Sequence, residues 1–173
     1  PAFDTTVAAF AYAFPVNKLV QALKHGEQLA LADSLADRVA RRIREIPDCI
    51  IPMPLHPARL RQRSFNQSQE LARRISRQLG VPLLPDACQR VKDTLPQSSL
   101  SGVERDRNMR HAFACTQNLS GLRIAMVDDV MTSGASLNEM AHALRNCGAI
   151  RISAWVVART LPRQGTTVIS SVA

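Results

Sequence analysis

The sequence predicts an α/β domain in which a mostly parallel sheet is flanked by helices. Short apolar runs at residues 49–51, 124–127 and 150–158 indicate strands, and segments with a helical apolar period separate them. The run at 124–127 is apolar without alternation, which is typical of a strand buried on both faces of a parallel sheet. Polar loops follow the first two runs, at the edge where open α/β sheets bind ligands.

Composition agrees with a single globular domain and narrows the classes of partner. The chain has 173 residues, 46% of them hydrophobic and 21% charged. Its formal charge of +8 favours anionic partners, and a phosphorylated metabolite, a nucleic acid and an anionic membrane surface all remain open on charge alone. No apolar run approaches the roughly 20 residues that span a bilayer, so we expect no membrane insertion. The amino end lacks the basic segment of a signal peptide, and its start at Pro1 suggests a truncated chain.

The cysteines indicate a reducing compartment. Cys49, Cys88, Cys115 and Cys147 are scattered, with no Cys-x-x-Cys pair and no histidine at metal-binding spacing. Dispersed thiols of this kind are usually small core residues. We therefore expect a cytoplasmic protein with no structural zinc site in this chain.

The amino-terminal part is predicted to hold two helices. Asn17 can cap a helix at 18–25, which Gly26 would end. A second helix is predicted at 27–45. Its apolar stripe has one residue in every fourth position: Leu31, Leu35, Val39 and Ile43.

A basic loop follows the strand at 49–51. Pro52 and Pro54 cannot donate to a sheet ladder, so pairing should stop near Ile51. The loop, residues 54–67, carries three arginines at alternate positions: Arg59, Arg61 and Arg63. Arginine makes forked, charge-assisted bonds to phosphate oxygens, so diphosphate fits this cluster; a solvated basic loop is the alternative. The next helix is marked by Leu71, Ile75 and Leu79 and runs to Gly80.

The middle of the chain is predicted to be less regular. Residues 81–91 indicate one or two short strands interrupted by prolines. Residues 92–110 are polar, lack a strong apolar period and are expected to be mobile; an ordinary surface connection is the alternative to a functional loop. Ser101 and Glu104 have capping-box spacing, so this segment can start a short helix that carries Arg105.

Two carboxylates and a short hydroxyl- and glycine-rich loop end the strand at 124–127. Hydroxyl donors are available from Thr132, Ser133 and Ser136, and Gly134 lets the backbone turn so that its N–H groups converge on a phosphate. A helix from residue 137 onward would point its positive end at that anion. Asp128 and Asp129 could accept hydrogen bonds from a sugar diol or share a hydrated Mg²⁺. The alternatives are a strand-end aspartate beside an ordinary helix cap, or an acidic phospho-acceptor pocket, which leaves the loop without a role.

Four further elements complete the domain. They are a strand at 111–115, a turn at 118–121, a helix from 137 to Gly148 and the strand at 150–158. We assign residues 1–159 to one domain and 160–173 to a tail that is a weak strand or disordered.

These residues resemble a known family. The apolar strand, Asp128, Asp129, two aliphatic residues and Thr132-Ser133-Gly134-Ala135-Ser136 look like the signature of type I phosphoribosyltransferases, which bind 5-phosphoribosyl-1-pyrophosphate (PRPP). Residues 54–67 narrow the resemblance to the ComF, or GntX-like, phosphoribosyltransferases, and imply the type I phosphoribosyltransferase-like fold. That family usually has Gly where this chain has Ser64, and it commonly carries a cysteine-rich zinc-binding segment ahead of this region. Its absence here fits an amino-terminal truncation or a shorter natural protein.

The resemblance implies a reaction and its site residues. PRPP would transfer its phosphoribosyl group to an unidentified nucleophile, and diphosphate would leave. The 5-phosphate would bind Thr132, Ser133, Gly134, Ala135 and Ser136, and diphosphate would bind Pro54, Leu55, His56, Arg61 and Arg63. The catalytic residues would be Asp128, Asp129, Arg61, Arg63 and Arg105, with the two aspartates also holding Mg²⁺, directly or through water. Residues 92–110 would be the flexible loop that closes over the site and excludes water.

The alternative function is a non-catalytic module that senses PRPP or assists DNA uptake through its basic surface. The resemblance implies an association with competence and the use of external DNA, which names a process and supplies no chemistry. An aromatic content of 4% argues against single-strand binding by base stacking. Candidate partners are PRPP or a related phosphosugar, an unidentified acceptor, the DNA-uptake machinery and a second copy of the chain.

Overall fold

Four parallel strands form the central sheet, in the order β1-β6-β5-β2. The computed structural model describes residues 1–24, 30–63, 65–92 and 111–161. The sheet strands are β1 (Thr5–Ala11), β2 (Cys49–Pro52), β5 (Arg123–Met131) and β6 (Arg151–Arg159), and a separate antiparallel ribbon joins β3 (Cys88–Arg90) to β4 (Phe113–Cys115). Because all four sheet strands are parallel, their carboxyl ends lie along one edge, with the end of β5 between those of β6 and β2.

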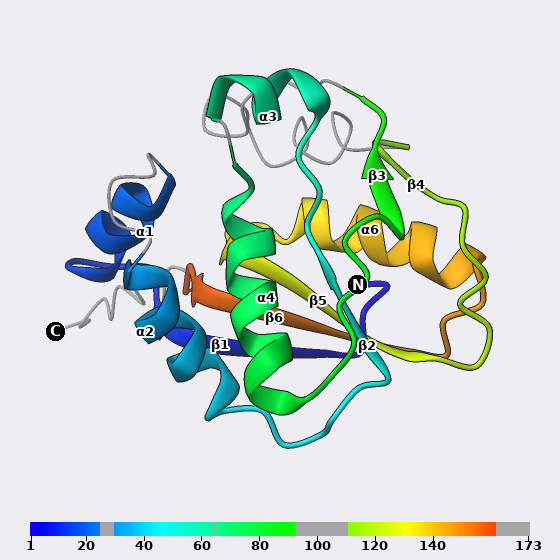
Figure 1. Ribbon diagram of the computed structural model, residues 1–173, viewed down its shortest axis with the longest axis horizontal. Coiled ribbons are helices and arrows are strands. Elements are labelled where there is room, and N and C mark those ends of the chain that lie inside the picture. Colours follow the sequence, from blue (N-terminus) through cyan, green and yellow to red (C-terminus); the bar gives the residue numbers. More distant parts are fainter. Residues whose placement is uncertain (25–29, 64, 93–110, 162–173) are drawn as a thin grey trace, which may run out of the picture.

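Helices lie on both faces of the sheet (Figure 1). They are α1 (Val16–Lys24), α2 (Ala30–Ala40), α3 (Pro57–Arg63), α4 (Gln67–Leu79) and α6 (Ala135–Asn146). One core cluster joins α1, α2 and α4 to Trp155 of β6, and a second joins α6 and the ribbon to the opposite face. None of the helices in the described ranges is long and apolar enough to cross a membrane.

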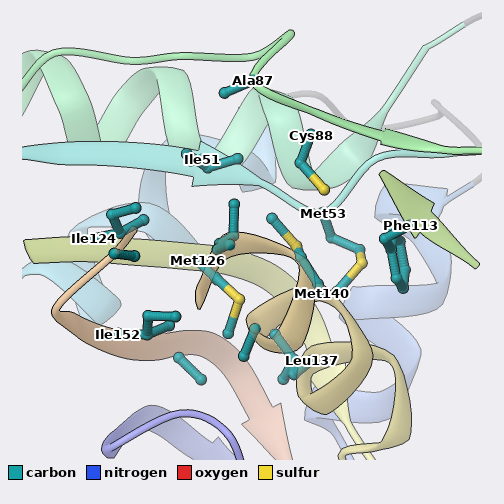
Figure 2. Packing of buried hydrophobic residues seen from close by; sticks show 14 of the residues in the cluster. Ile51, Met53, Ala87, Cys88, Phe113, Ile124, Met126, Leu137, Met140 and Ile152 are labelled. Atoms are coloured by element: carbon teal, nitrogen blue, oxygen red, sulfur yellow. The ribbon is translucent and has the colours of Figure 1, made fainter. Parts of the chain in front are cut away.

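β5 is the centre of both cores, as the unbroken apolar run at 124–127 predicted. Ala125 and Val127 face the α2–α4 side, whereas Ile124 and Met126 face the α6 side, and each is at most 1% exposed. Figure 2 shows Met126 among the side chains of α6 and the neighbouring strands. A strand buried on both faces meets solvent only at its ends, at Arg123 and at the carboxyl end.

The cysteines take the core positions that the sequence indicated. Cys49 and Cys88 are buried, and Cys115 and Cys147 are half-buried; all four thiols are free. Burial raises the pKa of the Cys88 thiol to about 12 and that of Cys49 to about 11, which keeps both protonated near neutral pH.

Several predicted element bounds are wrong. β1 was not predicted, because its uncharged sequence lacks a clear alternation and its strand conformation depends on pairing with β6. The second helix ends at Ala40 rather than at residue 45; the chain then tightens into turns in which Ile43 donates to the carbonyl of Ala40. Asn17 lies inside α1 rather than before it.

The other elements agree with the sequence. α4 ends at Gly80, whose φ of 66° is left-handed, and its predicted stripe is buried at Leu71 and Ile75. β4 and β6 lie within two residues of their predicted ranges, whereas β3 occupies only the last part of the range 81–91 in which one or two strands were predicted. α6 begins at Ala135, two residues earlier than expected.

Candidate functional site

The two carboxylates lie on β5 itself, where the sequence predicted that the strand had already ended. Pairing with β6 continues through Asp128 and Val130 to Met131, because β6 offers partners as far as Arg159. Asp128 and Asp129 are therefore carried by a paired, rigid backbone.

The loop after β5 forms the predicted turn at the start of α6. Gly134 has φ 82°, a left-handed conformation that strains residues with a Cβ, and it is the N-cap of the helix. A small hollow at this point is lined by Asp128 and by loop residues that include Thr132, Gly134 and Ser136. The hollow thus combines a helix amino terminus with backbone and hydroxyl groups, the arrangement that binds phosphate in many proteins.

Ser133 lies differently from the other predicted phosphate ligands. Its hydroxyl accepts a hydrogen bond from the Ala135 N–H at 3.4 Å, and its side chain lines a larger cavity of about 610 Å³ between α6 and β1. Neither Asp128 nor Asp129 lines that cavity, whereas Asp128 lines the small hollow. Ser133 instead supports the loop through the hydrogen bond that its hydroxyl accepts from Ala135.

Side chains at the start of α4 hold both aspartates. The Ser68 hydroxyl donates to Asp128 Oδ1 at 2.9 Å, and the Gln67 amide donates to Asp129 Oδ2 at 3.4 Å. Gln67, Ser68 and Asp129 are at most 5% exposed, whereas Asp128 is half-buried. Sequence reasoning missed Gln67 and Ser68. The available signal was two polar residues directly after a good N-cap, Asn66, at the carboxyl side of a strand.

Asn66 joins this helix end to the end of β2. Its side-chain oxygen accepts from the N–H groups of Ser68 and Gln69, and its amide nitrogen donates to the carbonyl of Met53 at 3.0 Å. The Met53 N–H in turn donates to Val127 of β5 at 2.8 Å. Pro54 is the first residue of the segment predicted to bind diphosphate. That segment therefore follows β2, the strand next to the one that carries Asp128.

The segment after β2 is helical where a loop was predicted. α3 occupies residues 57–63, and the N–H groups of Arg59 and Leu60 donate to the carbonyl of His56, which begins its first turn. The loop was predicted because Pro52 and Pro54 end strand pairing, but Pro57 sits favourably in a first helical turn. Leu55 and Pro54 line a cavity of about 270 Å³ on the ribbon side of α3.

The two predicted diphosphate arginines are placed unequally. Arg63 donates to Gln67 Oε1 at 3.5 Å, and Gln67 in turn donates to Asp129. Gln67 therefore links Arg63 to this carboxylate. Arg61 is exposed on α3, and no hydrogen bond joins it to another described site residue. Arg105, Ser64 and most of the predicted flexible loop lie outside the described residues.

Comparison with known proteins identifies the family. The phosphoribosyl transferase domain family matches residues 66–170, and Competence protein F of Haemophilus influenzae is 36% identical over 92% of this chain and 74% of its own length. The chain is a ComF-like type I phosphoribosyltransferase family member. DNA utilization protein YhgH of Escherichia coli K12 is 32% identical to this phosphoribosyltransferase domain, over 93% of the domain and 74% of the relative.

Solved structures confirm the predicted fold. The allosteric regulatory enzyme of purine biosynthesis aligns with a TM-score of 0.52 at 17% identity, over 74% of this phosphoribosyltransferase domain but only 25% of that chain. Glutamine PRPP amidotransferase from B. subtilis aligns with a TM-score of 0.51, over 73% of the domain and 26% of that chain. At this identity the likeness concerns the fold alone.

Proposed function

We propose that this domain binds PRPP with Mg²⁺ and transfers the phosphoribosyl group to a nucleophile, with release of diphosphate. The observation that supports this most is the hollow at the start of α6, which adjoins Asp128 on the same strand. A ligand that fills it needs a phosphate for the helix end and hydroxyl groups for the carboxylates. A phosphorylated sugar carries both.

The residues at the carboxyl edge of the sheet each have a role in this proposal. Thr132 and Ser136 bind the 5-phosphate with the loop backbone, and the two aspartates orient the ribose. The backbone after Met53 and the guanidinium of Arg63 face the diphosphate, where positive charge stabilises the leaving group as the bond to C1 breaks. Holding the ribose between these fixed groups lowers the entropy cost of reaching the reactive geometry.

The donor set fits Mg²⁺ held mainly by substrate. Adjacent carboxylates at Asp128 and Asp129 are the oxygen ligands that this ion prefers, and the described residues contain no cluster of three histidine, cysteine, aspartate or glutamate side chains for a metal. In this proposal Mg²⁺ would take further oxygens from PRPP and water. When bound, it supplies charge neutralisation of the diphosphate.

Calorimetric titration of PRPP with Mg²⁺ tests the site. The parent protein should give saturable heat, the Asp128→Asn/Asp129→Asn double variant should lose it, and addition of a chelator should weaken parent binding. Asp37→Asn, which removes a half-buried carboxylate of α2 that pairs with Arg41, serves as the matched control and should bind like the parent. Equal heats from the parent and the double variant, or none from the parent, would reject the proposal.

A role in DNA use is the second candidate. It is favoured by the names of two relatives, Competence protein F and DNA utilization protein YhgH, and by the net charge of +8. Phosphate contacts make DNA binding weaken steeply as salt rises. Salt-dependent binding of single-stranded DNA by the domain would support this role, and identical weak retention at all salt concentrations would count against it.

A further inference from the structure

Three of the four cysteines gather where the β3–β4 ribbon meets the end of α6. Cys88 and Cys115 are directly opposite each other in the ribbon, and Cys147 follows the last residue of α6. The Cys147 thiol donates a hydrogen bond to the carbonyl of Cys115 at 3.0 Å, although 32 positions separate the two residues. The sulfur of Cys147 therefore lies within the reach of one side chain from Cys115.

Backbone hydrogen bonds hold the two elements together at this point. The Leu119 N–H donates to the carbonyl of Cys147 at 2.8 Å, and the Gly121 N–H donates to the carbonyl of Gly148 at 3.2 Å. These bonds fix the turn after β4 against the end of α6. A disulfide forms readily only between residues that the fold already holds at close range, with Cα atoms about 4–7 Å apart. Cys115 and Cys147 are held in this way before any bond forms.

Cys88 is a poorer partner for Cys115. Its side chain is 1% exposed, and Figure 2 shows it within the core beside Ile51 and Met53. Opposite residues of an antiparallel pair have Cβ atoms roughly 4.5–5.5 Å apart, which exceeds the separation of about 3.8 Å that a disulfide prefers. Cys115 and Cys147 are only half-buried, so a small oxidant can reach them.

We propose that Cys115 and Cys147 form a modification site, at which a peroxide generates a reversible intramolecular disulfide. One thiolate attacks the peroxide, its O–O bond breaks, and the sulfur becomes a sulfenic acid while hydroxide leaves and is protonated to water. The other thiol attacks that sulfur, so the S–S bond forms as the S–O bond breaks and a second water leaves. Together the pair loses two electrons and two protons, and one hydrogen peroxide becomes two waters.

The environment of the pair makes it unreactive without such an oxidant. Burial, and then a hydrogen bond with Cys147, raise the pKa of the Cys115 thiol to about 11. This thiol is therefore protonated near neutral pH, where only thiolates react rapidly. The reduced pair is the resting state, as the free thiols show.

The disulfide would brace the segment that carries the candidate site. It closes a loop of the chain that contains β5, both aspartates and α6. Such a cross-link restricts the unfolded chain and so stabilises the folded domain. Cys147 and Gly134 lie at opposite ends of α6, which for 12 residues is roughly 18 Å long. The inference goes beyond the proposed function and does not require PRPP binding.

Peptide mapping of the parent protein tests the pairing. Trypsin places the four cysteines on four separate peptides, residues 45–59, 78–90, 111–123 and 146–151. After treatment of the folded protein with hydrogen peroxide and alkylation, peptides 111–123 and 146–151 should be joined, and dithiothreitol should separate them. Four alkylated thiols, a linkage of 78–90 to 111–123, or a linkage found only in a covalent dimer would overturn the proposal.

Serine variants test the effect on stability. Oxidation should raise the Tm of the parent by roughly 5 °C or more, and Cys115→Ser and Cys147→Ser should each lose both the linkage and the rise. Cys49→Ala, which removes a buried thiol of β2, is the control and should keep both. The same rise in Cys147→Ser as in the parent would contradict the proposal. If neither serine variant folds, the peptide map of the parent decides alone.

Discussion

The loops that end β5 and β2 lie on neighbouring strands but are built in different ways. The loop after β5 is shaped by its own residues: Gly134 turns the backbone, and the Ser133 hydroxyl accepts from Ala135. The segment after β2 is fixed from elsewhere, because Asn66 holds the carbonyl of Met53. The conformation of the first loop can therefore be predicted from its own residues, whereas that of the second depends on a residue outside it and is harder to predict.

The largest expected effect is the loss of PRPP binding when Gly134 is replaced. A replacement that strains the backbone elsewhere serves as the comparison. Gly134→Val and Gly121→Val both place a β-branched residue at a left-handed φ, 82° and 77°, and each should lose about 1–3 kcal/mol of stability. Gly121 lies at the opposite edge of the sheet. We expect only Gly134→Val to abolish PRPP binding in calorimetry, whereas equal binding by the two variants would show that the turn is not the phosphate site.

A smaller effect should come from the support of Asp128. Ser68→Ala removes the hydroxyl that donates to this carboxylate and should cost about 1 kcal/mol of stability and about fivefold in PRPP affinity. Ser76→Ala removes a hydroxyl that bonds the Val81 carbonyl at the other end of α4. Chemical denaturation should show similar losses, but the control should keep parental PRPP affinity; a shared loss of affinity would contradict a local role for Ser68.

Two of the three arginines of α3, Arg61 and Arg63, give a sharper comparison within the segment after β2. Arg63 contacts Gln67, and Arg61 is exposed. Arg63→Met should therefore weaken binding of inorganic diphosphate more than Arg61→Met, by about tenfold if one charge-assisted bond is lost. A larger loss in Arg61→Met would mean that α3 changes position when the ligand binds.

The smallest effect concerns the starts of the same two strands. The Arg123 guanidinium and N–H hydrogen-bond Asp48 and lower the pKa of this carboxyl to about 2. A depressed folded-state pKa stabilises the protein above the unfolded value near 4, and this contribution is lost as pH falls towards 2. Asp48→Asn should melt at a lower temperature than the parent at pH 5, and the gap should narrow by pH 2.5. A constant gap would contradict this linkage.

Elements with strong local patterns could be predicted, and those that depend on partners could not. The predictions made from the apolar run at 124–127 and from the Leu71–Ile75 stripe were correct. A strand buried on both faces, or a helix buried on one, needs apolar residues at its buried positions. β1 was missed because an uncharged edge strand becomes a strand by pairing with β6. The end of β5 was misplaced for the same reason.

The sequence by itself determined the family, the parallel α/β fold and the order of acids, glycine and hydroxyls at and after the end of β5, since these depend on neighbours a few residues apart. Only the tertiary structure decided that Gln67 and Ser68 hold the two aspartates, and that Arg63 contacts Gln67 while Arg61 is exposed. The contacts of Gln67 and Ser68 with the aspartates join residues 62 and 60 positions apart in the chain. Their distances follow from strand order and helix packing, which no local pattern of residues encodes.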